Sequence, residues 1–405
     1  MLSVDEALGE VLTQAQPLPA ERRLALEALG LTLAEDIHAD IDLPPFDKAL
    51  VDGYAIKVAE FESGVREYFV GEEILAGKTP ERPLANGEAA AIMTGAPIPV
   101  GADGVVMIER TSLVDGRVHL EEMAVRPGMN IMRQGREMKT GDLILSRGDW
   151  INPARIGLLA SVGRTEVEVI PPPLIRILPT GDELVEPGQK PGPGQIRNSN
   201  ALMLAALVSN AGARAEILPV ARDESQHLSD AISHGLGADV LLITGGVSAG
   251  NRDLVPETLE SLGVRRTFHK VKLKPGKPLW FGVGLPRGDR PPTLVFGLPG
   301  NPVSGIVGFL LFVRPALAAM AGLSRRDPTA RRRPLSRSFK HQSDRPTYHP
   351  SRLIPSPDGG YTIDPLSWAG SADLRAVGSC DGFAVFPAGD REYAQGDVVD
   401  FFDLD

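Results

Sequence analysis

The stretch from Ala238 to Gly250, ADVLLITGGVSAG, constrains the fold of this 405-residue chain more than any other. It begins with a short apolar run, Val240 to Ile243, which is typical of a strand buried on both faces of a parallel sheet. A helix is predicted over 253–262, so the turn between them lies at a helix N-terminus, where the dipole favours negative charge. This turn has no bulky side chain, so its backbone N–H groups can approach an anion closely; its residues include Thr244, Gly245, Gly246, Ser248 and Gly250.

The pattern alone leaves two interpretations open. Close packing between strand and helix would require glycines at the same places. The stretch is not a Walker loop, because no lysine followed by serine or threonine comes after the glycines, and it lacks the GxGxxG spacing of a dinucleotide fold. The surrounding sequence has to decide between an anion site and a packing turn.

Charge and cysteine content restrict the class of protein. Lysine and arginine number 42 and aspartate and glutamate 52, and the net charge of −10 argues against a nucleic-acid-binding protein while allowing a local basic pocket. Cys380 is the only cysteine, which excludes an internal disulfide and fits a reducing cytoplasm. The N-terminal residues lack a basic segment and a long apolar core, and no run of about 18 apolar residues is present. We therefore expect a cytoplasmic protein without a membrane span.

The metal-binding residue types point to hard cations. The seven histidines are scattered, without the clustered His and Cys ligands that zinc needs, so a transition-metal site is not expected. Carboxylates suited to Mg²⁺ are plentiful.

The first 170 residues read as helices followed by short strands. Ser3 and Glu6 form a predicted capping box ahead of a helix that reaches Gln14, and a second helix is predicted over 20–29. Short strands broken by Gly and Pro follow, which is the profile of a small β-rich module. A helix over 153–161 and an alternating strand then lead to the stiff run from Pro171 to Pro173, which marks a domain boundary.

Beyond this boundary, strands and helices alternate, which predicts a mostly parallel sheet with helices on both faces. The basic segment 325–337 reads as a solvated linker, and the short strands of 338–405 as a small β-domain. The strands are predicted over 174–178, 216–220, 240–243, 268–273, 279–283 and 293–296, and the helices over 200–210, 225–236, 253–262 and 302–320.

Chemically active residues follow these predicted strands. Ligands of α/β sheets bind at the carboxyl ends of the strands, so these residues are expected to share one rim. Acids, an anion-binding turn and a lysine pair on one rim suit a nucleotide diphosphate, its magnesium and a second oxyanion, although each acid could equally cap a helix. The residues are Asp182 and Glu183 in PTGDEL, Asp223 in ARDE, Asp253 after the glycine turn, Lys274 and Lys277 in KLKPGKP, and Asn301 and Ser304 in GLPGNPVSG.

The motifs resemble those of the molybdopterin molybdenumtransferase family, the MoeA-like enzymes related to the C-terminal half of gephyrin. The resemblance covers essentially the whole chain and follows the order of the family. The motifs are PPFDKALVDGYAI, AAAIMTGAPIP, NIMRQGREMKTGD, LPTGDELVEPG, GQIRNSN, ITGGVSAGNRD, LKPGKPLWFG and GLPGNPVSG.

The resemblance implies a multidomain α/β plus β fold and an elongated homodimer whose active site lies at the subunit junction. It also implies the reaction, in which molybdate enters the dithiolene of adenylated molybdopterin and AMP leaves in a magnesium-dependent step. It allows transient contacts with the adenylyltransferase and with acceptor molybdoenzymes, and it implies neither nucleic acid nor membrane as a partner. The implied domains are 1–44 with 141–170 (helices and a mixed linker), 45–140 (β-rich module), 171–325 (α/β, molybdopterin-binding-like) and 326–405 (C-terminal β-domain).

The residues of this sequence that match functional positions of the family come from every domain. One region departs from the family pattern: Tyr348 is followed by His349 and Pro350, where the family often has an arginine shortly after an aromatic residue. The implied catalytic acids are Asp52, Glu183, Asp223 and Asp253, the last two as magnesium ligands. The implied substrate contacts are Thr94, Glu137, Gly245, Gly246, Ser248, Lys274, Lys277, Pro278, Pro299, Asn301, Ser304, Arg345 and Ser371.

Two other functions stay open. An adenylyltransferase of the same fold would make the adenylated pterin rather than consume it, but such relatives usually consist of the α/β domain alone. A non-catalytic scaffold, as the related half of gephyrin is at synapses, would not need the acids and lysines that this chain keeps.

Overall fold

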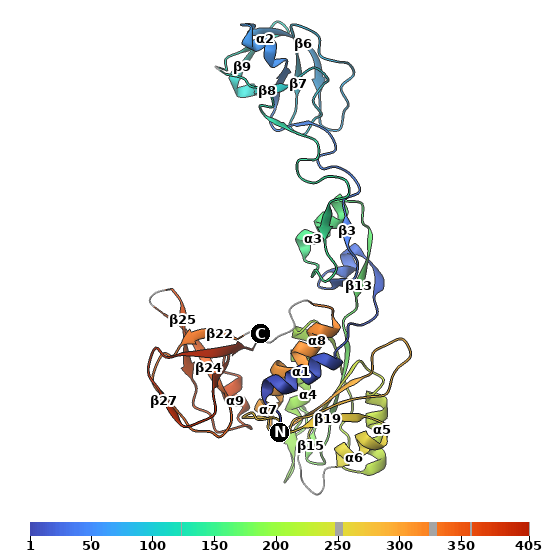
Figure 1. Ribbon diagram of the computed structural model, residues 1–405, viewed down its shortest axis with the longest axis vertical. Coiled ribbons are helices and arrows are strands. Elements are labelled where there is room, and N and C mark those ends of the chain that lie inside the picture. The colour runs from blue at the N-terminus through green and yellow to red at the C-terminus, as the bar shows by residue number, and fades with distance from the viewer. Residues whose placement is uncertain (123, 248–253, 324–329, 357–358, 405) are drawn as a thin grey trace. The chain divides into compact units, whose positions relative to one another are not determined.

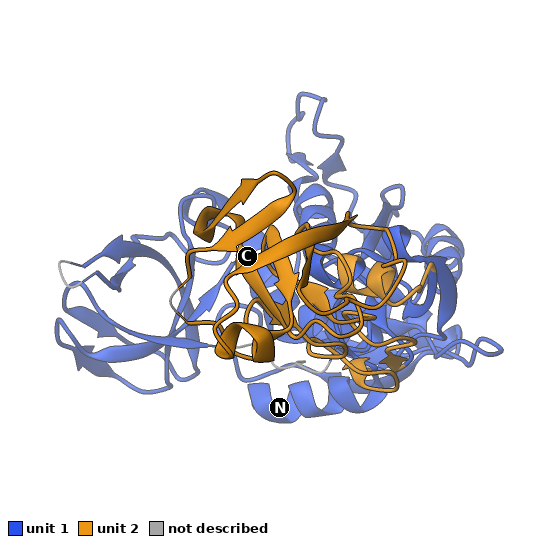
Figure 2. Cartoon of the chain, turned by 90° about the horizontal axis from the view of Figure 1, so that it is seen from above, with its two compact units in different colours: residues 1–35, 147–156, 166–405 blue, residues 36–146, 157–165 orange. Residues whose placement is uncertain are grey.

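The computed structural model describes residues 1–122, 124–247, 254–323, 330–356 and 359–404. The chain forms two compact units (Figure 2). Unit 1 comprises Met1–Glu35, Arg147–Ile156 and Glu166–Asp405, and unit 2 comprises Asp36–Ser146 and Gly157–Thr165. The finer division into four domains stays a prediction.

A six-stranded, mostly parallel sheet is the centre of unit 1, as the strand–helix alternation predicted (Figure 1). The first four strands of its order run parallel, and the last two form an antiparallel hairpin at one edge. The final strand of this order therefore ends at the same rim as the parallel strands. The order is β17 (Arg214–Ile217), β14 (Leu174–Pro179), β18 (Val240–Thr244), β21 (Leu294–Leu298), β20 (Trp280–Val283) and β19 (Arg265–His269).

Helices cover both faces of this sheet, and the alternation along β18 shows why. Val240 and Leu242 pack into one core cluster, whereas Leu241 and Ile243 pack into another on the opposite face. The first face carries α1 (Val4–Gln14), α4 (Ser199–Asn210), α7 (Pro302–Gly308), η3 (Phe309–Val313) and α8 (Arg314–Met320). The second carries α5 (Ser225–Gly235) and α6 (Leu254–Ser261).

Helix α1 begins with the predicted capping box. The Ser3 hydroxyl accepts from the N–H of Glu6, and the Glu6 carboxylate accepts from the N–H of Ser3. Both hydrogen bonds satisfy donors that a helix start leaves without partners.

The helical run 302–320 is apolar enough to resemble a membrane span, although Arg314 interrupts it. By its length and its mean hydropathy of 1.9 it could cross a membrane, and it is the single such helix in the described part of the chain. However, 89% of its apolar window is buried inside the structure, which is what the core helix of an α/β sheet requires. A π-helical segment, η3, interrupts the α-helix that the sequence predicted as continuous.

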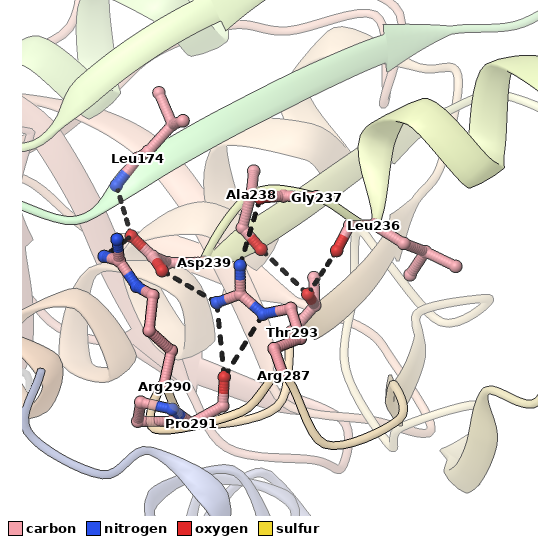
Figure 3. A network of polar contacts seen from close by, with 9 residues as sticks. All are labelled: Leu174, Leu236, Gly237, Ala238, Asp239, Arg287, Arg290, Pro291 and Thr293. Carbon is pink, nitrogen blue, oxygen red and sulfur yellow. Dashed lines mark hydrogen bonds and ion pairs between the residues drawn. The ribbon is translucent and has the colours of Figure 1, made fainter.

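A network of charges fixes the amino end of β18 (Figure 3). The carboxylate of Asp239, only 1% exposed, forms ion pairs of 2.8 Å with Arg287 and 3.1 Å with Arg290. It also accepts from the N–H of Leu174, and Arg287 donates to the carbonyl of Gly237. The buried charge is thus paired and hydrogen-bonded, as a carboxylate in a protein interior must be.

The predicted helix over 20–29 is wrong. Residues Glu21–Leu24 form strand β1, followed by a single 3₁₀ turn, η1 (Ala25–Ala28). β1 pairs antiparallel with β13 (Glu166–Ile170), and β2 (Thr32–Leu33) lies on the other side of β13. The helix over 153–161 is confirmed as α3 (Pro153–Ser161).

The C-terminal part of unit 1 is the small β-domain that the sequence predicted. Its core is aromatic, with Phe386 and Phe401 fully buried and Tyr393 packed edge-on against Phe386. The five-stranded sheet runs β22 (Arg331–Pro334), β28 (Val398–Asp403), β26 (Gly382–Phe386), β24 (Thr347–Pro355) and β25 (Tyr361–Pro365). Smaller elements are the pairs β23 (Phe339–His341) with β27 (Arg391–Tyr393) and β15 (Leu184–Val185) with β16 (Ile196–Arg197), and helix α9 (Leu374–Val377).

Unit 2 is the β-rich module. Buried side chains line both faces of its main sheet, with Tyr54 and Ile56 in one cluster and Ala55 in another. The strand order is β8 (Gly104–Met107), β5 (Gly53–Ile56), β7 (Glu88–Ile92), β6 (Glu67–Ile74), β10 (Arg117–Leu120) and β9 (Thr111–Val114). The other elements are α2 (Val58–Glu62), η2 (Ile108–Arg110), and the pairs β4 (Lys48–Ala49) with β11 (Ile131–Met132) and β3 (Ile37–His38) with β12 (Leu143–Leu145).

Candidate active site

A basic cavity of about 250 Å³ lies at the carboxyl rim of the unit 1 sheet and is called here the lysine pocket. The turn between β19 and β20 supplies one wall, the loop between β21 and α7 supplies another, and the C-terminal β-domain completes it. Eight residues that the sequence placed at the site meet here: Lys274, Lys277, Pro278, Pro299, Asn301, Ser304, Arg345 and Ser371. The other lining residues are Leu273, Pro275, Gly276, Trp368 and Gly370.

The lysine-bearing turn is held by backbone hydrogen bonds on both sides. On one side the N–H of Lys272 donates to the carbonyl of Leu2. On the other, Lys274 donates to the carbonyl of Pro346 and accepts from the N–H of Tyr348. The N-terminus and the C-terminal β-domain therefore fix the turn, which pre-positions the two lysine side chains.

The loop after β21 connects the lysine pocket to the C-terminal β-domain. Asn301 donates from Nδ2 to the hydroxyl of Ser371 at 2.9 Å, and Val303 donates from its backbone to the carbonyl of Ser371. Asn301 is the N-cap of α7 but makes no side-chain cap bond, so its amide serves Ser371 instead. Ser304, in the first turn of α7, is 3% exposed.

The lysine pocket is positively charged although the whole chain is acidic. Its lining includes Lys274, Lys277 and Arg345 and no carboxylate. Outside the lining, Asp344 accepts from Nε of Arg345 at 2.9 Å, and this hydrogen bond lowers the pKa of Asp344. Three cations around a small cavity suit a multiply charged oxyanion.

A second, smaller cavity of about 80 Å³, the glycine pocket, lies beside the same loop. Successive residues of the loop alternate between the cavities, since Pro299 and Asn301 line the lysine pocket whereas Gly300 and Pro302 line the glycine pocket. The remaining lining comes from the β14 and β18 ends, the β15–β16 pair and the start of α4: Thr180, Glu183, Leu184, Ile196, Arg197, Asn198, Ser199, Asn200, Thr244 and Gly245.

The two described glycines of the central turn are required by close packing. Gly245 and Gly246 have φ of +94° and +60°, and a Cβ on Gly245 would lie 2.6 Å from the carbonyl oxygen of Thr180. A Cβ on Gly246 would lie 2.7 Å from Val255. The N–H of Gly245 donates to the carbonyl of Leu298, so this group is already paired within the protein. The packing interpretation is therefore confirmed for Gly245 and Gly246, and the anion-site interpretation stays a prediction.

Asn200 is a pocket residue that the sequence reasoning missed. Its Nδ2 donates to the carbonyl of Gly300 at 2.7 Å, which fixes the orientation of the amide. Its Oδ1 is buried and has no hydrogen-bond partner among the described residues. A buried acceptor of this kind calls for a donor on a ligand. The motif GQIRNSN contained this signal, but the sequence could not tell which asparagine faces a cavity.

The expected acids of unit 1 that the structure describes lie near the same rim and do not form a ready-made metal centre among themselves. Glu183 lines the glycine pocket, and Asp223 donates from its backbone to Asp182 at 3.4 Å. Asp253 and Ser248 lie outside the described residues. Within the described ranges, no group of three or more His, Cys, Asp or Glu side chains could hold a metal ion.

Unit 2 holds the three residues that the family resemblance implied there. The carboxylate of Asp52 accepts both the N–H and the hydroxyl of Thr94, and these hydrogen bonds lower the pKa of Asp52. Glu137 forms an ion pair of 3.6 Å with Lys48 on β4. Strand β4 also exchanges backbone hydrogen bonds with the loop after Thr94, through Ala49. The loops that carry Asp52, Thr94 and Glu137 therefore adjoin one another.

Comparisons with known proteins define the class of this chain. Residues 2–163 match the MoeA N-terminal region (domain I and II), 176–319 a probable molybdopterin binding domain, and 332–404 the MoeA C-terminal region (domain IV). The α/β region 176–319, which carries the basic rim, therefore belongs to the class of probable molybdopterin binding domains. In this chain a MoeA N-terminal region precedes it and a MoeA C-terminal region follows it.

Full-length relatives identify the family. The chain is 32% identical over 406 residues to the molybdopterin molybdenumtransferase of Staphylococcus aureus (strain Mu50), covering 98% of this chain and 94% of that protein. The crystal structure of the molybdopterin biosynthesis MoeA protein of Pyrococcus horikosii aligns with a TM-score of 0.84 at 29% identity, over 100% of this chain and 99% of that one. A molybdenum cofactor biosynthesis protein of Pyrococcus furiosus, with a TM-score of 0.59 at 20% identity over 100% of this chain and 99% of that one, shares the fold. The chain belongs to the molybdopterin molybdenumtransferase family, whose enzymes act in molybdenum cofactor biosynthesis.

Proposed function

We propose that this chain inserts molybdate into adenylated molybdopterin and releases AMP. The observation that carries the proposal is the lysine pocket, a cavity of about 250 Å³ whose lining includes three cations and no carboxylate. Such a pocket favours a small dianion over a neutral or cationic ligand. The names of the full-length relatives support molybdate as that dianion.

The loop 299–302 explains how the two substrates would meet. Its alternating residues line both the lysine pocket and the glycine pocket, so ligands in the two cavities would be neighbours. Binding the adenylated pterin at the glycine pocket would hold its dithiolene beside the oxyanion. Metal insertion would then be effectively intramolecular, which removes much of the entropic barrier.

The acids at the rim fit the donor chemistry of Mg²⁺. Magnesium keeps several waters and needs only one or two carboxylates besides substrate phosphates, so the lack of a three-residue cluster among the described residues is compatible with it. We infer that Asp223 and Asp253 would hold the ion, with Glu183 oriented toward the substrate. When bound, the ion would neutralise charge on the pyrophosphate link.

We infer that Asp52, Thr94 and Glu137 serve the site of a second subunit in a homodimer. The two hydrogen bonds from Thr94 favour the ionised form of the Asp52 carboxylate and fix its orientation. A residue that only forms a turn would not need either effect. Mixing Asp52→Ala with Asp253→Ala subunits tests this, because one heterodimer site would then be intact. No recovery of activity after verified subunit exchange would argue against a shared site.

We also propose a cytoplasmic location, because the single cysteine fits a reducing compartment. Transient contacts with the adenylyltransferase that makes the substrate and with acceptor molybdoenzymes belong to the same proposal.

One assay separates this function from its rivals. Purified protein is incubated with adenylated molybdopterin, magnesium and molybdate, and AMP is measured. We expect AMP release that depends on molybdate. An adenylyltransferase would instead form adenylated molybdopterin from molybdopterin and ATP, and a scaffold would do neither.

A further inference from the structure

A cavity of about 470 Å³ lies within the C-terminal β-domain and is called here the arginine pocket. It shares one lining residue, Trp368, with the lysine pocket and is otherwise separate from it. The lining residues are Arg352, Leu366, Ser367, Trp368, Ala369, Asp373, Arg375, Ala376 and Ser379.

Two guanidinium groups in this lining are available to a ligand. Arg352 donates from Nε to the carbonyl of Ser379 at 2.6 Å, which orients its guanidinium and leaves its terminal nitrogens without a described partner. Arg375 makes no side-chain hydrogen bond to any residue that the structure describes. Neither arginine has an ion-pair partner within 4.0 Å across the described ranges.

The single carboxylate of the lining is already committed to the backbone. Asp373 accepts from the N–H of Ala369 at 2.9 Å and from the N–H of Ala376 at 3.1 Å. These two hydrogen bonds lower the pKa of Asp373, with a smaller contribution from the charge of Arg375. Asp373 therefore holds the wall of the cavity together, and the lining keeps a net positive charge.

The aromatic wall of the pocket is rigid. The ring of Trp368 meets the ring of His349 edge-on at 5.5 Å, and Nε2 of the buried His349 donates to the carbonyl of Leu366 at 2.8 Å. Leu366 also donates from its backbone to the carbonyl of Pro350. Both ends of the Leu366–Ala369 segment are thus fixed, so the cavity needs no rearrangement to bind a ligand.

We propose that the arginine pocket is a second anion-binding site, which takes a tetrahedral oxyanion group either free or as the phosphate of a nucleotide. Two guanidinium groups recognise such a group through paired charge-assisted hydrogen bonds. The volume falls within the range of small-molecule sites, and the lining includes the aromatic side chain of Trp368. The shared Trp368 puts this anion next to the proposed oxyanion of the lysine pocket.

The test uses the full chain and isothermal titration with three probes: inorganic phosphate, AMP and molybdate. The variant Lys274→Ala/Lys277→Ala disables the lysine pocket, so the part of the remaining binding that responds to substitutions at Arg352 and Arg375 reports on the arginine pocket. Adding Arg352→Gln/Arg375→Gln to this variant should weaken the remaining binding by at least about tenfold. The matched control is Arg391→Gln, an exposed arginine of the same β-domain outside both pockets.

Each outcome decides the proposal. Remaining binding of inorganic phosphate that the arginine substitutions weaken supports a site for free oxyanions. Remaining binding of AMP alone supports a nucleotide site at the arginine pocket only if the arginine substitutions weaken it, because AMP bound at the glycine pocket would not respond to them. The proposal is overturned if the lysine variant binds none of the probes, or if the arginine substitutions change nothing. Should the arginine double variant lose its thermal transition, Arg375→Gln alone gives the test. Whether the lysine substitutions abolish molybdate binding is a separate readout for the proposed function.

Discussion

Asp52 and Thr94 are joined by two hydrogen bonds of 2.7 Å that end on the same carboxylate oxygen of Asp52. These hydrogen bonds fix the orientation of the Asp52 side chain. From the sequence alone, Asp52 could have been only a turn residue before Gly53. Asp52→Asn keeps an acceptor for Thr94 but removes the charge. We expect unchanged thermal stability and a fall in AMP release by on the order of a hundredfold, the scale of one lost electrostatic contact. Asp115→Asn, an exposed turn residue of the same unit, is the control; equal activity of both variants would leave Asp52 a structural role.

The second prediction concerns molybdate binding at the lysine pocket. Lys274→Ala/Lys277→Ala should remove molybdate binding at the lysine pocket while the protein stays folded, because both side chains stand on a turn whose backbone is held independently of them. Each lost charge-assisted contact should cost roughly 1.5–3 kcal/mol. Titration calorimetry measures the affinity, with Lys190→Ala, exposed in the same α/β region, as control. Unchanged affinity in the folded variant would refute the assignment.

The buried acceptor of Asn200 predicts a contact with the pterin substrate. Asn200→Ala should weaken the binding of adenylated molybdopterin by about tenfold, since a ligand donor loses its partner. Loss of the hydrogen bond to Gly300 should cost stability by only about 1 kcal/mol. Asn210→Ala, at the exposed end of the same helix, is the control. A variant that loses stability but keeps full affinity would make Asn200 a structural residue.

A substitution at Asp253 can distinguish a helix-capping role from a magnesium-binding role. It lies outside the described residues, directly before α6, where a carboxylate could either cap the helix or hold magnesium. Asp253→Asn caps about as well but binds magnesium poorly. We expect unchanged stability and substrate binding, with magnesium-dependent AMP release reduced on the order of a hundredfold. A normal rate would assign Asp253 to the cap alone.

His349 predicts how stability depends on pH. Burial lowers its pKa to about 4, from 6.5 in the unfolded chain. Below pH 6.5 the unfolded state therefore takes up a proton that the folded state refuses, so the free energy of unfolding falls as the pH falls toward 4. The loss approaches about 3 kcal/mol at the lower limit. Denaturant titrations at several pH values measure it.

The His349→Gln variant supplies the comparison for this prediction. Glutamine does not titrate, so the fall between pH 6.5 and 4 should be shallower in the variant than in the wild type. The exposed His119, replaced in the same way, is the control. Parallel curves for wild type and His349→Gln would mean that His349 titrates normally in the folded protein.

Buried apolar runs were the reliable signal in this sequence. The strand Val240–Thr244 was predicted within one residue because every one of its side chains is buried. The helix over 20–29 was wrong because AERRLALEAL consists of good helix formers, yet Glu21–Leu24 pairs with Glu166–Ile170, far along the chain. Local propensity cannot anticipate such a partner.

The candidate site shows the same limit. Lys274 and Asn301 could be grouped because both follow strands that end at one rim. Arg345 and Ser371 came only from the family resemblance, since no local pattern says how the C-terminal β-domain packs against that rim. Trp368 was missed altogether, because a tryptophan in the loop between β25 and α9 carries no local signal for a cavity.

The backbone hydrogen bonds between Lys274 and the segment Pro346–Tyr348 have a consequence for protein engineering and for evolution. The C-terminal β-domain is not an interchangeable module, because it contributes part of the frame that holds the lysine turn. A chimera that takes this domain from a relative would have to take the turn 270–278 with it, or match both backbones. Recombination between family members should therefore succeed more often when the two segments are inherited together than when the crossover falls in the linker between them.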